Sequence, residues 1–191
     1  MKILGIDYGL NTGFAIIDFN ERTANIVDSL NIKLLHEVVS KNQLLYKRLE
    51  HLHNLISDIC AHHNITLAAI ESLGNAKDEN PILLHPQDIT TINRLWRSSN
   101  HYYEQAIETL VNLKIPVYSV SRRFLFNCLF GYDIISGQRW GKLIGEKLQE
   151  ITEFRSHDRR DAVGSALGLY CYLNNTTIIP TIENMWLKHN V

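Results

Sequence analysis

Short apolar runs separated by turn residues dominate the first 33 residues of the chain. Residues 2–6 and 13–17 form short, mainly apolar runs, and a glycine-bearing turn lies between them. Runs of this length joined by a short turn are typical of the two strands of an antiparallel hairpin. Residues 23–33 follow another polar turn and predict a third strand. The pattern therefore predicts an antiparallel meander at the start of the chain.

The apolar period changes after the meander. From about residue 36 to residue 63, apolar side chains recur at steps of three and four, which predicts a long amphipathic helix. The short apolar run over residues 67–70 has the length of a central parallel strand that is covered on both faces. Glu71 comes directly after this run, as Asp7 comes directly after the first strand. The polar ends of parallel strands are where open α/β sheets place their ligands.

The second half of the chain predicts helices around one further strand. The predicted elements are a helix over 88–112, a strand over 114–120, and helices over 121–130 and 138–151, the last of them basic. Asp88 is a suitable N-cap for the first of these helices. Residues 72–87 form a long irregular segment beside Glu71. Its apolar trio, residues 82–84, could be a wedge, an interface or a core plug, and a core plug is the simplest interpretation.

The last predicted helix begins with acidic side chains and continues with small ones. Asp158 and Asp161 are three residues apart and face the same side of the first turn, and His157 could reach that side. The helix dipole alone is a sufficient explanation for acids in a first turn. Gly164 and Gly168 each cost about 1 kcal/mol relative to alanine in a helix interior. They predict that the helix lies very close to a neighbouring backbone, with its acidic end against the sheet.

Asp7 allows two interpretations. It could be an ordinary turn residue whose carboxylate bonds its own backbone. Alternatively it binds a cation, since a carboxylate costs several kcal/mol to bury without a partner. Gly9 and Gly13 would let the backbone turn with positive φ and would leave room for a ligand beside the carboxylate. This stretch alone does not decide between the two.

The length and composition of the chain are those of a single globular domain. A chain of 191 residues fits one domain, and 45% hydrophobic with 20% charged residues is ordinary for a globular protein. We expect one domain over residues 1–173, followed by a tail over 174–191 that either docks or is flexible. The net charge of −1 argues against a uniformly basic surface. It leaves a nucleic-acid partner open, because local patches matter more than totals.

The cysteines and the chain start predict a cytoplasmic protein. Cys60, Cys128 and Cys171 are far apart and surrounded by apolar residues, as expected for buried thiols in a reducing compartment. The first strand leaves no room for a signal or transit sequence, and no apolar stretch has the length of a membrane span. We therefore expect no membrane partner, and a location in the bacterial cytoplasm, or in that of a host if a phage or virus encodes the protein.

Four carboxylates stand at the ends of predicted buried elements: Asp7, Glu71, Asp158 and Asp161. If the sheet brings those ends together, their repulsion requires counter-cations. Hard divalent ions with oxygen ligands, Mg²⁺ or Mn²⁺, are the expected solution. Two such ions per site would activate a water molecule and stabilise the leaving oxygen in phosphodiester cleavage. No small-molecule cofactor is expected.

The order of these features resembles the RuvC-type Holliday junction resolvases of the RNase H-like superfamily. The matching motifs are Ile6-Asp7-x-Gly9 with Gly13, Ile70-Glu71, and Asp158-x-x-Asp161-Ala162. The resemblance covers the chain from residue 1 to about residue 173. It implies an α/β fold in which a mixed sheet, three antiparallel strands followed by parallel strands, is flanked by helices.

The resemblance also implies an activity. Family members are homodimers that nick four-way DNA junctions symmetrically with Mg²⁺. The four carboxylates named above correspond to the family's acidic tetrad, both as catalytic residues and as metal ligands. His157 and Lys142 are possible auxiliary residues. The candidates for contacts with DNA phosphates are Arg94, Arg97, Arg122, Arg123, Arg139 and Lys142.

The chain departs from the family pattern after Glu71. The family's aromatic wedge is replaced by Ser72-Leu73-Gly74, and residues 78–81 reshape the following loop. Because of these departures, the resemblance does not extend to junction unstacking or to sequence preference. A divergent or viral resolvase explains them naturally.

Three other interpretations compete with the resolvase. An actin-like or sugar-kinase-like phosphotransferase also has Asp-x-Gly in its first hairpin, but it needs two duplicated halves and a second glycine-rich phosphate loop. A different RNase H-like nuclease would act on RNA or RNA–DNA hybrids. A non-catalytic branched-DNA-binding protein would use the acids only as helix caps and strand ends. Metal dependence distinguishes this non-catalytic protein from a nuclease, because a pure binding protein leaves DNA intact when Mg²⁺ is present.

Overall fold

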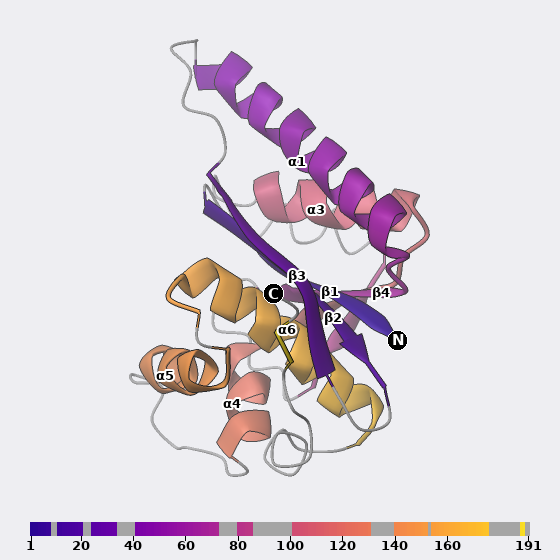
Figure 1. The fold of residues 1–191 in the computed structure, drawn as a ribbon. Helices are drawn as coiled ribbons and strands as arrows, with labels where there is room; N and C mark the ends of the chain where they lie inside the picture. Colours follow the sequence, from indigo (N-terminus) through magenta and orange to yellow (C-terminus); the bar gives the residue numbers. More distant parts are fainter. Residues whose placement is uncertain are drawn as a thin grey trace.

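A mixed β-sheet with helices on both faces forms the centre of the molecule (Figure 1). In the computed structural model, the residues that are described are 1–8, 11–20, 24–33, 41–72, 80–85, 101–130, 140–152, 154–175 and 188–189. Within them the sheet has seven strands in the order β5-β6-β4-β1-β2-β3-β7. No helix in this part of the chain is long and apolar enough to cross a membrane.

The first three strands form the predicted antiparallel meander. They are β1 (Lys2–Asp7), β2 (Asn11–Phe19) and β3 (Ala24–Lys33). The register of the first hairpin places Asp7 opposite Gly13, and an irregularity between Ile16 and Ile17 shifts the pairing of β2 with β3. The sequence prediction for this part of the sheet is confirmed.

The parallel part of the sheet begins at β4 (Leu67–Glu71), which pairs with both β1 and β6 (Val117–Val120) in parallel. This confirms the predicted central strand before Glu71. Strand β6 begins three residues later than predicted, because Lys114 has a positive φ of 60° and belongs to a turn. In that turn its N–H donates to the carbonyl of Val111 at 2.9 Å.

The apolar trio of the irregular segment is an edge strand, which the sequence pattern did not predict. Strand β5 (Ile82–Leu84) pairs with β6 in the antiparallel direction. Leu84 is buried, whereas Ile82 and Leu83 are 45% and 37% exposed, so the trio is only partly a core plug. At the opposite edge, the two-residue strand β7 (Lys188–His189) pairs with β3 in parallel.

Helices α1 (Lys41–His63) and α3 (His101–Asn112) cover one face of the sheet (Figure 1). The apolar stripe predicted for the first helix is buried at Leu52, Ile56 and Ile59. These side chains pack in one cluster with Leu4 and Ile6 of β1. The predicted beginnings of both helices, residues 36–40 and 88–100, lie outside the described residues.

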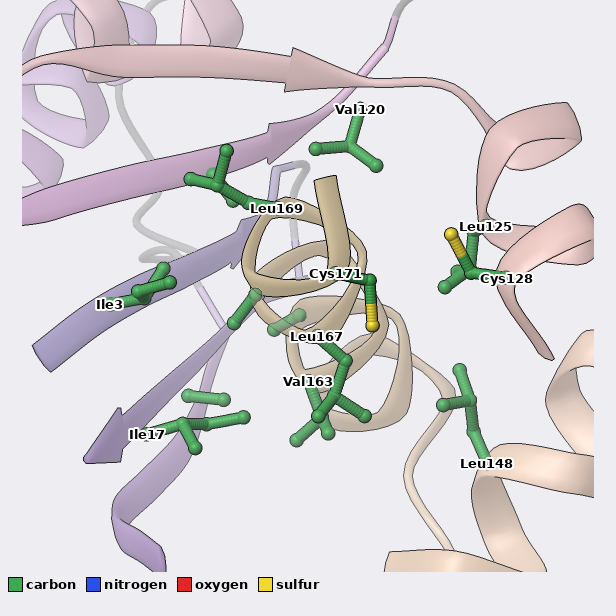
Figure 2. Close-up of a cluster of buried hydrophobic side chains, with 14 of the residues drawn as sticks. Ile3, Ile17, Val120, Leu125, Cys128, Leu148, Val163, Leu167, Leu169 and Cys171 are labelled. Carbon is green, nitrogen blue, oxygen red and sulfur yellow. The ribbon is translucent and has the colours of Figure 1, made fainter. Parts of the chain in front are cut away.

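Helices α4 (Arg122–Phe130), α5 (Trp140–Thr152) and α6 (His157–Leu173) cover the other face. Figure 2 shows how α6 fills the space between the sheet and the two outer helices. Val163 and Leu167 of α6 lie in one core cluster with Ile3 of β1, Cys128 of α4 and Leu148 of α5. Successive residues of a strand point to opposite faces, which explains why Ile3 joins this cluster while Leu4 joins the other.

Glycines permit the close approach of α6 to the sheet, but they are not the glycines that the sequence singled out. A Cβ at Gly5 would lie 1.9 Å from the main-chain oxygen of Ala162, and one at Gly13 would lie 2.0 Å from that of Asp158. Gly13 therefore makes room for a helix rather than for a ligand, and it lies within strand β2. In contrast, Cβ atoms at Gly164 and Gly168 would meet side chains of β6, α4 and α5 at 2.8 to 3.0 Å. The prediction that the helix lies against a neighbouring backbone is correct, but the glycines of that contact are on the strands.

Candidate metal centre

Three carboxylates converge at one end of the sheet. Asp7 ends β1, Glu71 ends β4, and Asp161 lies in the first turns of α6. One oxygen from each carboxylate lies within 4.8 Å of an oxygen of the others. The two strands are parallel neighbours, so their carboxyl ends meet at the same edge. The helix reaches this edge because its first turn packs on Gly13, opposite Asp7.

Asp158, the fourth predicted acid, lies near this group without belonging to it. Its negative charge contributes to raising the pKa of both Asp7 and Asp161. Its main chain forms the contact with Gly13. The N-cap of the helix is Ser156, whose side-chain oxygen accepts a hydrogen bond from the N–H of Arg159. The helix start is therefore fixed by a cap and by a backbone contact, and both hold Asp161 in place.

The pKa values of the acids show an excess of negative charge. The pKa of Asp7 rises to about 8, chiefly through burial and then through the neighbouring charges of Glu71, Asp161 and Asp158, against a lowering by Arg122. The pKa of Asp161 rises to about 6, chiefly through burial and then through Glu71. Crowded carboxylates of this kind either share protons or bind cations. A divalent ion would let all of them ionise.

The donor set fits a hard divalent cation. It consists of carboxylate oxygens from three different elements, which are the ligands preferred by Mg²⁺ and Mn²⁺. It has no sulfur or imidazole donor, so it does not fit a soft metal. Asp7 and Glu71 sit on the ends of strands in the middle of the sheet, and such positions give ligands a rigid support.

Arg122 contacts two of the three carboxylates. Its Nε donates a hydrogen bond to Oε1 of Glu71, and its Nη2 lies 3.8 Å from Oδ2 of Asp161. The preceding residue, Ser121, caps helix α4 by accepting a hydrogen bond from the N–H of Phe124 at 3.1 Å. Arg122 is thus held at the first position of α4, directly after β6, which neighbours β4.

A cavity of about 320 Å³ opens beside the carboxylates. Its polar lining includes Glu71, Arg122, Lys142, His157 and Asp161. The rest of the lining consists of Val120, Ser121, Leu125, Ile144 and Ser165. The side chain of Lys142 is 78% exposed, and its Nζ lies 3.7 Å from Oε1 of Glu146, one turn further along α5. Two cationic side chains and one histidine therefore surround an opening that leads to the acids.

The predicted DNA-binding residues are only partly described by the structure. Arg122 and Lys142 line the cavity, and Arg123 follows on the same helix. Arg94, Arg97 and Arg139 lie outside the described residues.

The sequence analysis missed one cation near the site. Arg160 is 4% exposed and lowers the pKa of the adjacent Asp161, while its Nη1 donates to Oε1 of Gln149. No sequence signal distinguishes it, because an arginine in a first helical turn is normally solvated. Its burial depends on the packing of α5 against α6.

The raised pKa of Asp7 predicts a pH dependence for the metal-free protein. The folded pKa of about 8 lies above the ordinary pKa of 3.8 for an aspartate, so the folded state binds the proton more tightly than the unfolded state. The contribution of Asp7 to stability is therefore fully present below about pH 4 and is lost as the pH rises to about 8. In EDTA, urea unfolding should show this loss for the wild type and a flatter profile for Asp7→Asn. Asp58→Asn, on the exposed surface of α1, should keep the wild-type profile; a wild-type profile for Asp7→Asn would contradict the assignment.

Strand order, meander and flanking helices define an RNase H-like fold. Among solved structures, the chain is similar to RuvC of Thermus thermophilus in complex with a Holliday junction substrate. The match has a TM-score of 0.62 and 12% identity, and it covers 92% of this chain and 96% of RuvC. A second structure of the same RuvC has a TM-score of 0.61 at 13% identity, covering 93% of this chain and 98% of that one.

The chain is also similar to Ydc2, the yeast mitochondrial Holliday junction resolvase. This match has a TM-score of 0.51 and 13% identity, and it covers 95% of this chain and 81% of Ydc2. The sequence matches no family model and no curated protein. The structural likeness therefore confirms the fold that the sequence resemblance implied.

Proposed function

We propose that this protein is a metal-dependent endonuclease that cleaves four-way or related branched DNA by paired nicks. The observation that carries the proposal is the convergence of Asp7, Glu71 and Asp161 at the end of a sheet. This sheet belongs to the fold shared with RuvC, which is known in complex with a Holliday junction substrate, and with Ydc2, a Holliday junction resolvase.

The acidic residues would hold the metal ions. Asp7, Glu71 and Asp161 supply oxygens from rigid elements, and Asp158 adds negative charge beside them. Two Mg²⁺ ions, or Mn²⁺ in their place, would supply an activated water molecule and stabilisation of the leaving oxygen. The acidic residues themselves fix the positions of the oxygen ligands and supply the negative charge that attracts the ions. Because Asp7 has a pKa of about 8, it must lose its proton to act as a ligand, so weakly alkaline conditions favour activity.

The cavity would take the DNA backbone. Arg122 and Lys142 line it on α4 and α5, where guanidinium and ammonium groups can neutralise phosphate oxygens. His157 also lines the cavity, next to Asp158 in the chain, and is placed to contact a group bound there. The apolar wall of Val120, Leu125 and Ile144 is compatible with the sugar and base that flank a phosphate.

A homodimer is part of the proposal. Paired nicks in a four-way junction require two active sites related by a two-fold axis, and a dimer of this chain would supply them. Sedimentation of the protein with and without junction DNA tests this, and a monomer that remains monomeric on DNA would exclude it.

Cleavage assays on labelled DNA test the activity itself. We expect four-way DNA to be nicked with Mg²⁺ and to remain intact in EDTA, with linear duplex cut far more slowly. Binding without cleavage in Mg²⁺ and in Mn²⁺ would favour the non-catalytic DNA-binding protein. Preferential cleavage of an RNA–DNA hybrid would favour the other type of RNase H-like nuclease.

A further inference from the structure

We propose that Arg122 takes the place of a divalent cation in the metal-free site, and that metal entry releases its guanidinium towards bound phosphate. This inference rests on the proposed function, because it concerns the same carboxylates. It adds a property of this chain: one arginine is counter-ion to the acids in one state and a DNA contact in the other.

The contacts of Arg122 are those of a cation shared between ligands. Its Nε donates to Glu71, and its Nη2 lies 3.8 Å from Asp161, so the guanidinium connects two of the three converging carboxylates. Its charge also lowers the pKa of the third, Asp7.

The position of Arg122 allows it to leave. Its backbone is fixed, because the N–H of Leu125 donates to the carbonyl of Ser121 at 3.0 Å and starts helix α4. Its side chain is 57% exposed and lines the cavity, so the guanidinium can rotate into solvent without disturbing the core. Arg160 provides the contrast: it is 4% exposed and held by Gln149, and it can act only as a fixed charge.

A metal ion and the guanidinium would compete for the same oxygens. Mg²⁺ binds carboxylate oxygens at 2.0–2.1 Å and requires near-octahedral geometry, which leaves little room for a hydrogen-bond donor on the same lone pairs. The ion and the arginine are also both positive, so bringing them together on Glu71 and Asp161 is unfavourable. Metal binding therefore displaces Arg122, and Arg122 weakens metal binding.

The cavity beside the carboxylates offers the displaced guanidinium a place to bind phosphate. The cavity that Arg122 lines also has Lys142 on its wall, from a different helix. A phosphate that enters between these side chains would meet Lys142 whether or not metal is bound. It would meet Arg122 only after the acids have received their ions. Phosphate binding by Arg122 is thereby coupled to loading of the site.

Calorimetry without DNA tests the competition. Ca²⁺, which takes the same oxygen ligands, is titrated at pH 9 into the wild type, Arg122→Gln and Lys142→Gln. We expect Arg122→Gln to bind Ca²⁺ about five- to tenfold more tightly than the wild type, since the bound ion no longer displaces a charged hydrogen bond. Lys142→Gln, which removes a charge from the same cavity without contacting Glu71 or Asp161, should stay within about twofold. Equal affinities in wild type and Arg122→Gln would overturn the inference.

DNA binding to the intact protein tests the release. In EDTA, Arg122→Gln should bind four-way DNA at least as well as the wild type, because the arginine is held by the acids. In Ca²⁺ it should bind several-fold more weakly, and the slope of log affinity against log salt should fall by about one. Lys142→Gln should lose affinity in both conditions. An equal loss for Arg122→Gln in both conditions would show that Arg122 contacts DNA independently of metal, and would overturn the release.

The two proposals fail in different ways. If wild type and Arg122→Gln bind Ca²⁺ with the same affinity, the site holds metal and the proposed nuclease stands, while the competition is excluded. If neither protein binds a divalent ion, and Asp7→Asn cleaves junction DNA no differently from the wild type, both the metal centre and the nuclease proposal are excluded.

Discussion

Replacing Asp7 by asparagine should reduce cleavage of four-way DNA by roughly a thousandfold or more while the DNA remains bound. The carboxylate ends the central strand β1, and one of its oxygens lies within 4.8 Å of oxygens of Glu71 and Asp161, so it is placed to bind a metal ion together with them. Metal ions contribute several kcal/mol of transition-state stabilisation, and each 1.36 kcal/mol corresponds to a tenfold change in rate. Asparagine keeps the shape of the side chain but loses the charge.

The measurement is single-turnover cleavage of labelled junction DNA, with binding measured in parallel in Ca²⁺. Binding should be unchanged or tighter, because the substitution removes a negative charge near the phosphates. Asp18→Asn is the matched control: Asp18 pairs with Lys2 in the register of the same hairpin, at the end opposite Asp7. Its activity should equal that of the wild type. Full activity of Asp7→Asn would exclude Asp7 as a metal ligand.

Adding a methyl group at Gly13 or Gly5 should destabilise the protein by about 3 kcal/mol or more. At both positions the new Cβ would lie within 2.0 Å of a main-chain oxygen of α6. Backbone atoms cannot rotate away as side chains do, so the whole helix must move from the sheet. Because α6 carries Asp161, the same displacement would pull this carboxylate away from Asp7 and Glu71.

Gly145→Ala is the control for these substitutions. This glycine lies in helix α5, and a Cβ there would meet only the ring of His157, at 3.9 Å and 4.0 Å, which is ordinary contact. Alanine in a helix interior is favoured over glycine by about 0.5–1 kcal/mol, so this variant should be slightly more stable than the wild type.

Chemical unfolding in EDTA gives the stabilities, and Ca²⁺ calorimetry on the folded fraction reports on the site. We expect Gly13→Ala to lose both stability and metal affinity, since its Cβ would lie against Asp158, three residues before Asp161. Wild-type stability for Gly13→Ala would show that the first turn of α6 does not rest on β2.

The elements that the sequence predicted best are those whose pattern is local. The meander follows from short apolar runs and turns, and β4 follows from a run of four apolar residues before an acid. The stripe of α1 follows from its helical period. The edge strand β5 escaped prediction because a run of three apolar residues is too short to show a period, and because it is ordered by pairing with β6, whose sequence lies more than thirty residues away.

The candidate site shows the same division. Asp7, Glu71, Asp158 and Asp161 could be proposed from their places at the ends of apolar elements, because an acid after a buried strand is visible in the sequence. Which of them converge could not be known without the sheet order that puts β1 beside β4 and without the glycine contact that lays α6 across β2. That contact reversed the interpretation of Gly13, from space for a ligand to space for a helix.

The chemical character of each segment can be read from the amino-acid sequence: apolar runs of strand and helix length, acids at their ends, and cations in the second half of the chain. The partners of these side chains follow from the folded arrangement, among them the pairing of Arg122 with Glu71 and Asp161 across 51 and 39 positions. The two kinds of interaction differ in how far apart along the chain the interacting residues lie. Hydrophobic periodicity acts between neighbours a few residues apart, whereas the electrostatic coupling of these side chains depends on distances that exist only after the sheet and α6 have packed together.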